Sequence, residues 1–146
     1  MPGIIFIFVV LIFSTAIIKY VTRPPYGDAS TTQINLESST IFSKDELLEV
    51  TNLIKEDFQE YRDCKLDELW YNEEQCTEIA QSHLQFSPKY SSLTLNDIVV
   101  ILGQFTAGAD GYNENCYFLP SDIYQCRWTL IRKPSGGWEI TERLAL

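Results

Sequence analysis

Apolar residues follow three different patterns along this chain of 146 residues. Residues 4–18 carry no charge and include only Ser14 and Thr15 as polar members. Across residues 42–84 apolar residues recur every three or four positions, which is the spacing of amphipathic helices. From residue 96 onward they form short runs or alternate with polar residues, which is typical of β-strands. We therefore expect an apolar N-terminal segment followed by an α+β domain.

Two helices are predicted in the first half of this domain. Ser43 and Glu46 have the spacing of a capping box, which satisfies free N–H groups at a helix start. Phe42 and Leu47 occupy the two positions of a hydrophobic staple. The apolar face of this helix consists of Leu47, Val50, Ile54, Phe58 and Tyr61. A second helix is predicted to begin after Asn72, with an apolar face formed by Cys76, Ile79, Ala80, His83 and Leu84.

Four strands are predicted, at residues 65–71, 96–106, 123–133 and 138–143. The second is rich in Val and Ile, as is typical of a strand buried on both faces. The third alternates apolar and polar residues, and a turn sequence at residues 134–137 joins it to the fourth as a hairpin. The polar residues 107–122 include three Gly or Pro and predict a long loop of the kind that is often functional.

Residues 1–23 are predicted to anchor the chain in a membrane. The uncharged run is shorter than the roughly 20 residues that span a bilayer, but Lys19 and Arg23 can snorkel, so that residues 4–23 contact lipid. The main alternative is a signal peptide cleaved near Ala16, although no basic residue precedes the apolar run. Packing of this segment inside a protein core is a further alternative.

Residues 24–41 are rich in Ser, Thr, Pro and Gly and predict a flexible linker, which leaves residues 42–146 as the folded domain. The sequence gives opposing signals about the side of the membrane on which this domain lies. Lys19 and Arg23 favour the cytoplasmic side by the positive-inside tendency. Four cysteines in a small domain favour an oxidising, extracytoplasmic compartment, and this is the location we expect.

The formal net charge of −9 argues against nucleic acid as a partner, because a phosphate binder needs a basic surface. The acidic residues are unevenly spread. Residues 43–86 contain 12 Asp or Glu against 4 Lys or Arg. Solvated helix faces explain most of this excess, and an acidic surface for a cationic partner is the alternative.

The four cysteines are Cys64, Cys76, Cys116 and Cys126. They form no Cys-x-x-Cys pair, so neither a metal site nor a redox motif is predicted, and no cofactor is expected. Three disulfide pairings exist for four cysteines, and we favour Cys64–Cys76 with Cys116–Cys126 because each closes a short loop. Free buried thiols are the alternative, which applies if the domain faces the cytoplasm.

The sequence offers no catalytic constellation. His83 is the single histidine, and its place on the apolar face of the second helix favours a partly buried ring with local partners. A catalytic role would need an orienting carboxylate and a pocket. Neighbouring carboxylates such as Glu73 and Glu74 point in different directions and form no acid/base pair. No Gly-rich phosphate cradle is present.

Four ordered segments resemble a known group of proteins. They are FSKDELLEVTNLIKEDFQEY, CKLDELWYNEEQ, DIVVILGQFTAG and CRWTLIRKPSGGWEI, which together cover most of residues 42–143. These segments resemble small bacterial extracytoplasmic proteins, often lipoproteins of unknown function, in the nuclear-transport-factor-like superfamily. The cysteine that carries lipid in that group is absent from this chain.

The resemblance implies a cone-shaped α+β fold, in which two amphipathic helices pack on a bent antiparallel sheet after one N-terminal apolar helix. Members of the superfamily use the open end of the cone to bind small molecules or for isomerase or dehydratase chemistry, and others dimerise through the sheet. Fold alone does not choose among these roles.

We expect a membrane-tethered, non-catalytic binding or accessory domain, with a small apolar ligand or a protein as partner. Weak candidates for ligand contact are Trp70, Tyr71, His83 and Trp128, although aromatic residues are more often core residues. The first alternative is an enzyme for proton transfer on a small substrate, with His83, Asp97 or Asp122 as its ionisable group. The second alternative is a structural module that forms a homodimer through its sheet.

Overall fold

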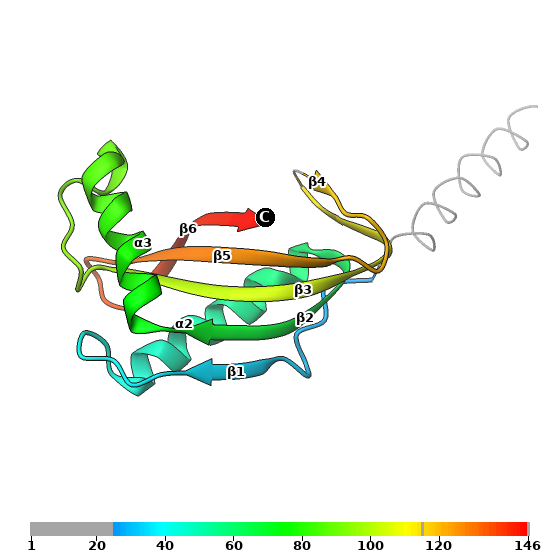
Figure 1. The fold of residues 1–146 in the computed structure, drawn as a ribbon, viewed down its shortest axis with the longest axis horizontal. Coiled ribbons are helices and arrows are strands. Elements are labelled where there is room, and N and C mark those ends of the chain that lie inside the picture. Colours follow the sequence, from blue (N-terminus) through cyan, green and yellow to red (C-terminus); the bar gives the residue numbers. More distant parts are fainter. Residues whose placement is uncertain (1–24, 115, 146) are drawn as a thin grey trace, which may run out of the picture.

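The computed structural model of this chain describes residues 25–114 and 116–145, which form two α-helices and a six-stranded sheet (Figure 1). In chain order the elements are β1 (Gln33–Leu36), α2 (Lys44–Asp57), η1 (Phe58–Glu60), β2 (Arg62–Tyr71), α3 (Glu73–Phe86), η2 (Pro88–Tyr90), β3 (Ile98–Asn113), β4 (Cys116–Tyr117), β5 (Ile123–Arg132) and β6 (Trp138–Ala145). The predicted α+β class, with two helices on a sheet, is confirmed.

The sheet is open and mostly antiparallel. Its strand order is β1-β2-β3-β5-β6, and the short β4 pairs with the far end of β3. The pairs β2–β3, β3–β5 and β5–β6 are antiparallel, as predicted. In contrast, β1 runs parallel to β2, with Gln33 opposite Glu68 and Leu36 opposite Tyr71. The sheet is therefore mixed, and the expectation of a purely antiparallel sheet is wrong at this edge.

The two helices lie on opposite faces of the sheet (Figure 1). Trp128 of β5 donates a hydrogen bond from its indole to Asp57 at the end of α2. The next residue, Thr129, faces His83 of α3 across 3.5 Å. Successive residues of a strand point to opposite faces, so α2 and α3 cover opposite sides of β5.

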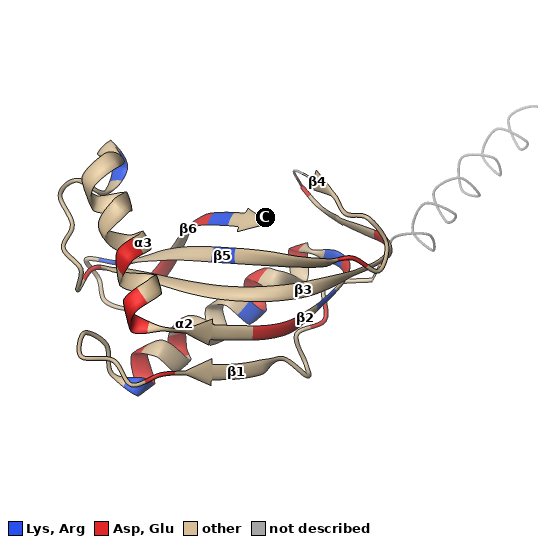
Figure 2. Ribbon diagram, in the orientation of Figure 1, with Lys and Arg blue, Asp and Glu red and all other residues tan. Residues whose placement is uncertain are grey.

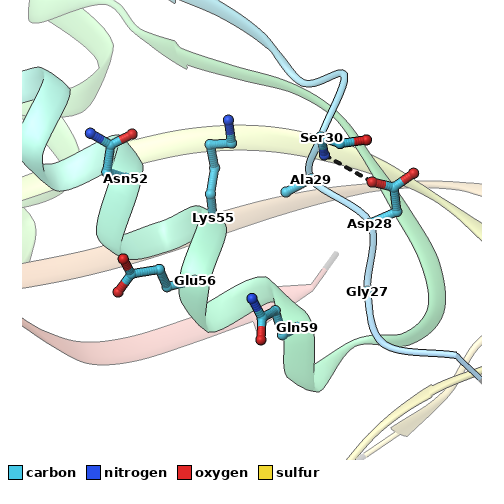
Figure 3. A pocket seen from close by; sticks show the side chains of 8 residues that line it. All are labelled: Gly27, Asp28, Ala29, Ser30, Asn52, Lys55, Glu56 and Gln59. Atoms are coloured by element: carbon cyan, nitrogen blue, oxygen red, sulfur yellow. Dashed lines mark hydrogen bonds between the residues drawn. The ribbon is translucent and has the colours of Figure 1, made fainter.

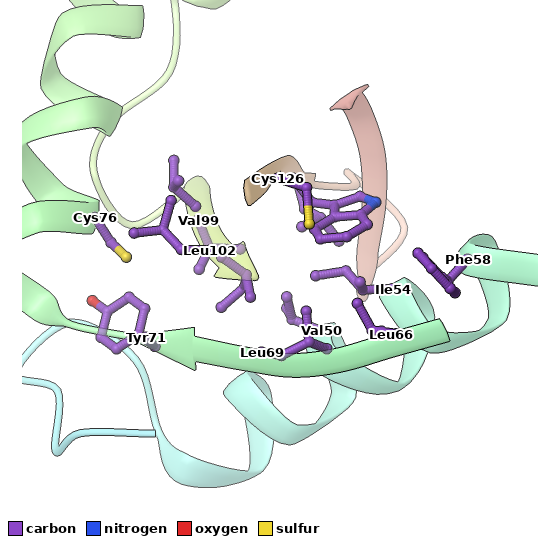
Figure 4. Close-up of a cluster of buried hydrophobic side chains, with 14 of the residues drawn as sticks. Val50, Ile54, Phe58, Leu66, Leu69, Tyr71, Cys76, Val99, Leu102 and Cys126 are labelled. Atoms are coloured by element: carbon purple, nitrogen blue, oxygen red, sulfur yellow. The ribbon is translucent and has the colours of Figure 1, made fainter. Parts of the chain in front are cut away.

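The main hydrophobic core lies between α2 and the sheet (Figure 4). Val50, Ile54 and Phe58 of the helix segment are fully buried, as are Leu66 and Leu69 of β2. The core continues into stacked or edge-on aromatic rings toward the end of β3, formed by Phe58, Tyr61, Phe105, Phe118 and Tyr124.

Both predicted helix starts are confirmed. The Ser43 hydroxyl accepts from the Glu46 N–H at 3.2 Å, and the Glu46 carboxylate accepts from the Ser43 N–H at 2.9 Å. Asn72 caps α3 by accepting from the Gln75 N–H at 2.9 Å. Phe42 is buried and meets Trp138 edge-on, so the residue before the cap joins α2 to the last strand.

The described part of the predicted linker is not a free segment. Pro25 accepts a hydrogen bond from the Asp63 N–H at 2.8 Å, and Asp28 donates to the Cys64 carbonyl at 2.9 Å. Gly27 lies so close to the Phe58 carbonyl that an added Cβ would stand 2.1 Å from that oxygen. Residues 25–41 therefore belong to the fold, because their backbone bonds to β2 and they contain β1.

The predicted loop 107–122 is also largely structured. β3 continues to Asn113 and pairs with the start of β2, with Cys64 opposite Ala107 and Arg62 opposite Tyr112. Gly108 leaves room for the Asp63 carboxylate, which accepts a hydrogen bond from the Asp110 N–H at 2.8 Å.

The N-terminal apolar run lies outside the described residues. Within 25–114 and 116–145, neither helix has the length and apolar character needed to cross a membrane.

Candidate ligand-binding cleft at the open end

A cleft of 570 Å³ opens at the end of the sheet where β3 finishes and β5 begins. We call this the open end, and the opposite end, where α3, Phe42 and Trp138 pack, the closed end. The lining of the cleft comes from β6, from the turn between β3 and β4, and from Glu60 and Tyr61 at the end of η1. The lining residues are Glu60, Tyr61, Asn113, Glu114, Cys116, Thr141, Glu142, Arg143, Leu144 and Ala145.

Tyr61 forms the floor of this cleft. Its ring stacks on Phe58 at 4.8 Å between centroids and on Phe118 at 6.1 Å, which fixes its position. Burial raises the pKa of Tyr61 to about 12, although Asn113 hydrogen-bonds the phenol. Tyr61 therefore offers a neutral hydroxyl near the base of the cleft at physiological pH.

The single cation of the cleft, Arg143, is already paired. Its Nε donates to both carboxylate oxygens of Asp57, at 2.8 and 2.7 Å, and its Nη2 donates to Oδ1 as well. Asp57 also accepts from the Trp128 indole at 3.1 Å. The hydrogen bond to Asp57 raises the pKa of Arg143, so the guanidinium remains charged and committed to this carboxylate.

The rim of the cleft is acidic. Glu60, Glu114 and Glu142 line it, while the charges of Arg143 and Asp57 cancel each other. The charges that remain on the lining are those of the three carboxylates, so the lining is negative. Both helices add further acidic side chains to the surface (Figure 2). A concave site of one sign attracts ligands of the opposite sign, so the cleft suits a cationic group.

His83 of α3 does not line this cleft but contacts Glu142, which does. Its Nε2 is 3.4 Å from the Glu142 carboxylate and 3.5 Å from the Thr129 hydroxyl. Its ring also meets Tyr90 edge-on at 5.3 Å between centroids. Burial lowers the pKa of His83 despite the opposing effect of Glu142, so the ring is neutral at pH 7. The sequence alone showed no carboxylate that could orient His83. In the structure this carboxylate is Glu142 of β6, 59 positions later in the chain (142 − 83).

The other residues proposed from the sequence do not gather around one site. Tyr71 and Trp128 are fully buried core residues. Trp70 is partly exposed on β2, away from the cleft lining. Asp97 accepts from the Thr94 N–H in a turn at the closed end, whereas Asp122 is exposed near the start of β5 at the open end. His83, Asp97 and Asp122 therefore cannot act on one substrate atom.

At the closed end, the interior between α3 and the sheet is filled. A narrow gap there is lined by apolar residues of α3 and β3, such as Ala80 and Val100, and by Phe42 and Tyr71, and it has no volume for even a water molecule. The side chains of the protein fill this part of the interior.

A second groove of 540 Å³ runs between α2 and the segment before β1 (Figure 3). Lys55, Glu56 and Gln59 of the helix segment line one side, and Asp28 lines the other. Ser30 lowers the pKa of Asp28 by hydrogen bonding to its carboxylate. The groove presents charges of both signs, so it has less preference for one ligand charge than the open-end cleft.

The favoured disulfides are not formed in the described structure, where all four cysteines are free thiols. Cys64 and Cys76 lie at the two ends of β2, because Cys64 is near its start and Cys76 belongs to α3, which follows it. Cys126 pairs with Gly103, whereas Cys116 pairs with Asn113, ten residues further along β3. Strands of this length separate both favoured pairs beyond the reach of a disulfide.

Comparison of the chain with models of known families, with characterised proteins and with solved structures finds no match. The geometry therefore identifies an α+β domain and a cleft, and no family is identified.

Sequence reasoning missed the residues that make this cleft. Glu114 and Cys116 lie in the segment that was expected to be a functional loop, so the polar composition there gave a usable signal. Glu142 and Arg143 gave none, because they look like ordinary polar positions of a final strand.

Proposed function

We propose that this chain is a membrane-tethered binding domain that takes a cationic ligand at the open-end cleft. The observation that carries the proposal is the acidic rim of Glu60, Glu114 and Glu142 around a site whose one cation is neutralised by Asp57. The volume of 570 Å³ lies in the range of small-molecule sites. The ligand class that fits is a linear polyamine or a short Lys- or Arg-rich peptide segment.

The tether in this proposal is the apolar N-terminal stretch, residues 4–23. The order of helix, strand, helix and antiparallel strands also supports the proposed likeness to the nuclear-transport-factor-like cone. Binding is favoured over catalysis because the titratable candidates are dispersed and the closed-end interior is filled.

The test is a calorimetric titration of the full chain in detergent micelles with spermine and with a tetralysine peptide. Replacing two rim carboxylates, Glu114→Gln with Glu142→Gln, is expected to weaken binding about tenfold, since each lost charge pair contributes up to about 1 kcal/mol. Raising the salt concentration is expected to weaken the wild-type complex in the same direction.

The matched control is Glu74→Gln with Glu78→Gln, which removes two exposed charges from α3 without touching the cleft. Equal losses in the two double variants would show non-specific attraction to an acidic protein and would overturn the proposed site.

One observation favours a second candidate function. Glu142 contacts the His83 ring and can orient it, as a carboxylate orients a general base. Proton-transfer chemistry on a small substrate is therefore the alternative function. This alternative predicts that a ligand in the cleft slows the modification of His83 by diethyl pyrocarbonate. Unchanged reactivity of His83 in the presence of every bound ligand would dismiss this alternative.

We propose the extracytoplasmic side of the membrane for this domain on its four cysteines alone, since the described structure forms neither of the favoured disulfides. Cys116 is the one exposed thiol among the four cysteines, so it gives a direct readout. A maleimide that does not cross membranes is expected to label Cys116 on intact spheroplasts. Labelling only after lysis would reverse this orientation.

A further inference from the structure

We propose that the open end of the domain rests on the bilayer surface, with Tyr26, Tyr117, Leu119 and Ile123 in the membrane interface. The proposal rests on the tether of the proposed function and adds the orientation of the domain on the membrane. It is carried by the place where the chain enters the fold and by the side chains exposed around that place.

The entry point of the chain is fixed to the domain. Pro25 accepts from the Asp63 N–H at 2.8 Å, and Gly27 donates to the Gln59 carbonyl at 3.2 Å. A stretch of two residues spans at most about 7 Å, so an anchor that ends at Arg23 holds Pro25 within that distance of its own end. No linker remains that would let the domain turn freely away from the lipid.

Exposed apolar side chains gather at this same end. Tyr117 is 85 % exposed, and the exposed fractions of Leu119, Ile123 and Tyr26 are 67 %, 65 % and 62 %. Four of the seven large hydrophobic residues that are exposed in the described part of the chain therefore lie in the entry segment, in β4 and in the stretch that leads from β4 into the start of β5. Such a concentration commonly marks an interaction surface.

The aromatic members form a continuous row with a basic residue. The Arg62 guanidinium lies 3.6 Å above the Tyr26 ring. Arg62 is opposite Tyr112 in the β2–β3 pairing, and Tyr112 is opposite Tyr117, with 5.5 Å between the two ring centroids. Tyrosine and arginine carry apolar bodies with polar tips, and both are favoured at the level of lipid headgroups.

The charges near these exposed side chains indicate which lipids the open end contacts. Asp63, Asp110, Glu114 and Asp122 lie close to these side chains in the chain and outnumber the two nearby cations, Arg23 and Arg62. Anionic lipids would be repelled by this end, so the contact is expected on neutral phosphatidylcholine and is expected to persist at high salt. The same arrangement places Cys116 and the ligand cleft beside the membrane.

The experiment uses the full chain reconstituted in phosphatidylcholine vesicles, with a polarity-sensitive fluorophore on Cys116. The other three thiols are buried, so the folded protein is labelled at one position. Contact with the interface is expected to shift the emission to the blue and to allow quenching by lipids that carry a nitroxide near the headgroup. A label at Gln85→Cys in a Cys116→Ser protein, near the exposed C-terminal end of α3, is expected to behave as in water.

Leu119→Ser with Ile123→Ser is expected to remove most of the blue shift and of the quenching at Cys116. Phe86→Ser is the matched control, because Phe86 is an equally exposed apolar residue (74 %) near the end of α3. It is expected to leave the signal unchanged, as is 0.5 M salt.

A Cys116 label that remains as water-exposed as the Gln85→Cys label, while the protein floats with the vesicles, would overturn this inference and leave the tether intact. A chain that fails to float with the vesicles would overturn the tether together with this inference. Neither result bears on the cleft, which the polyamine titration tests separately.

Discussion

The two ends of α2 each hold a carboxylate that pairs with an arginine of the sheet, but the two pairs differ in their surroundings. At the start of the helix, Glu46 binds Arg132 at 2.8 Å, and its side chain is 30 % exposed. At the last residue of the helix, Asp57 binds Arg143, and its side chain is only 9 % exposed. Similar chemistry therefore operates in two different dielectric environments.

The helix dipole makes the contrast stronger. Glu46 lies where the positive end of the dipole favours a carboxylate, and the capping box gives it local partners. Asp57 lies at the negative end, where a carboxylate is disfavoured. Asp57 depends on the distant partners Arg143 and Trp128, so the pair at the open end is the one whose loss the protein tolerates least.

The largest expected effect is that of Asp57→Ala. The change leaves the buried Trp128 indole N–H without a partner and frees Arg143, so the free energy of unfolding is expected to fall by about 3 kcal/mol. Urea denaturation followed by tryptophan fluorescence measures it. Glu46→Ala is the matched comparison, and an equal loss in both variants would contradict the difference between the two ends.

Trp128→Phe sharpens the comparison by keeping Arg143 in place. It removes the indole N–H and part of the buried ring, and we expect a loss of about 2 kcal/mol. If Asp57 depends on both partners, combining this change with Arg143→Gln is expected to give a non-additive result in a double-mutant cycle. Strict additivity would show that the two partners act independently.

Ser43→Ala removes the side chain that caps α2. The Glu46 N–H then loses its partner, and the expected loss is about 1 kcal/mol. Thermal unfolding followed by circular dichroism is a suitable measurement, with Ser43→Asp as a control that restores a cap. A control that fails to recover stability would place the effect elsewhere than at the helix start.

Arg132→Gln addresses the exposed pair. Arg132 also lies 4.4 Å from the Trp138 ring centroid, but solvent screens its contact with Glu46, so we expect a loss of about 0.5 kcal/mol. A loss as large as that of Asp57→Ala would show that exposure does not distinguish the two ends.

Acid pH gives the smallest and most specific test. The Ser43 backbone N–H, followed by Arg132, lowers the pKa of Glu46 below 4.5 in the folded state. The unfolded chain therefore takes up a proton first, so this contribution is complete above pH 4.5 and is lost as the pH falls below it. Glu46→Gln is expected to flatten the decline of the unfolding free energy between pH 5 and pH 3, whereas the exposed Glu78→Gln is not.

The sequence predicted best where all the partners are close in the chain. Ser43 and Glu46 specify the start of α2 within four residues, and the structure reproduces both of their roles. Phe42 packs against Trp138, and its predicted staple with Leu47 stays a prediction. The amphipathic faces of both helices were likewise visible, because helical periodicity is a local property.

The predictions failed where the partner is distant. Asp57 and Arg143 are 86 positions apart, and nothing near either residue signals the pair. β1 has only four residues, and the strand that completes its pairing lies beyond α2, so its segment looked like a linker. The open-end cleft is assembled from η1, β6 and the β3–β4 turn, and only the fold brings these together.

The parallel edge strand has a consequence for the timing of synthesis. Leu36 pairs with Tyr71, so β1 leaves the ribosome 35 residues before its partner is complete (71 − 36). At about 5–20 residues per second this corresponds to a delay of roughly 2–7 s. During that interval β1 has no strand to pair with. The time at which it pairs therefore depends on the rate of translation rather than on the strength of its own hydrogen bonds.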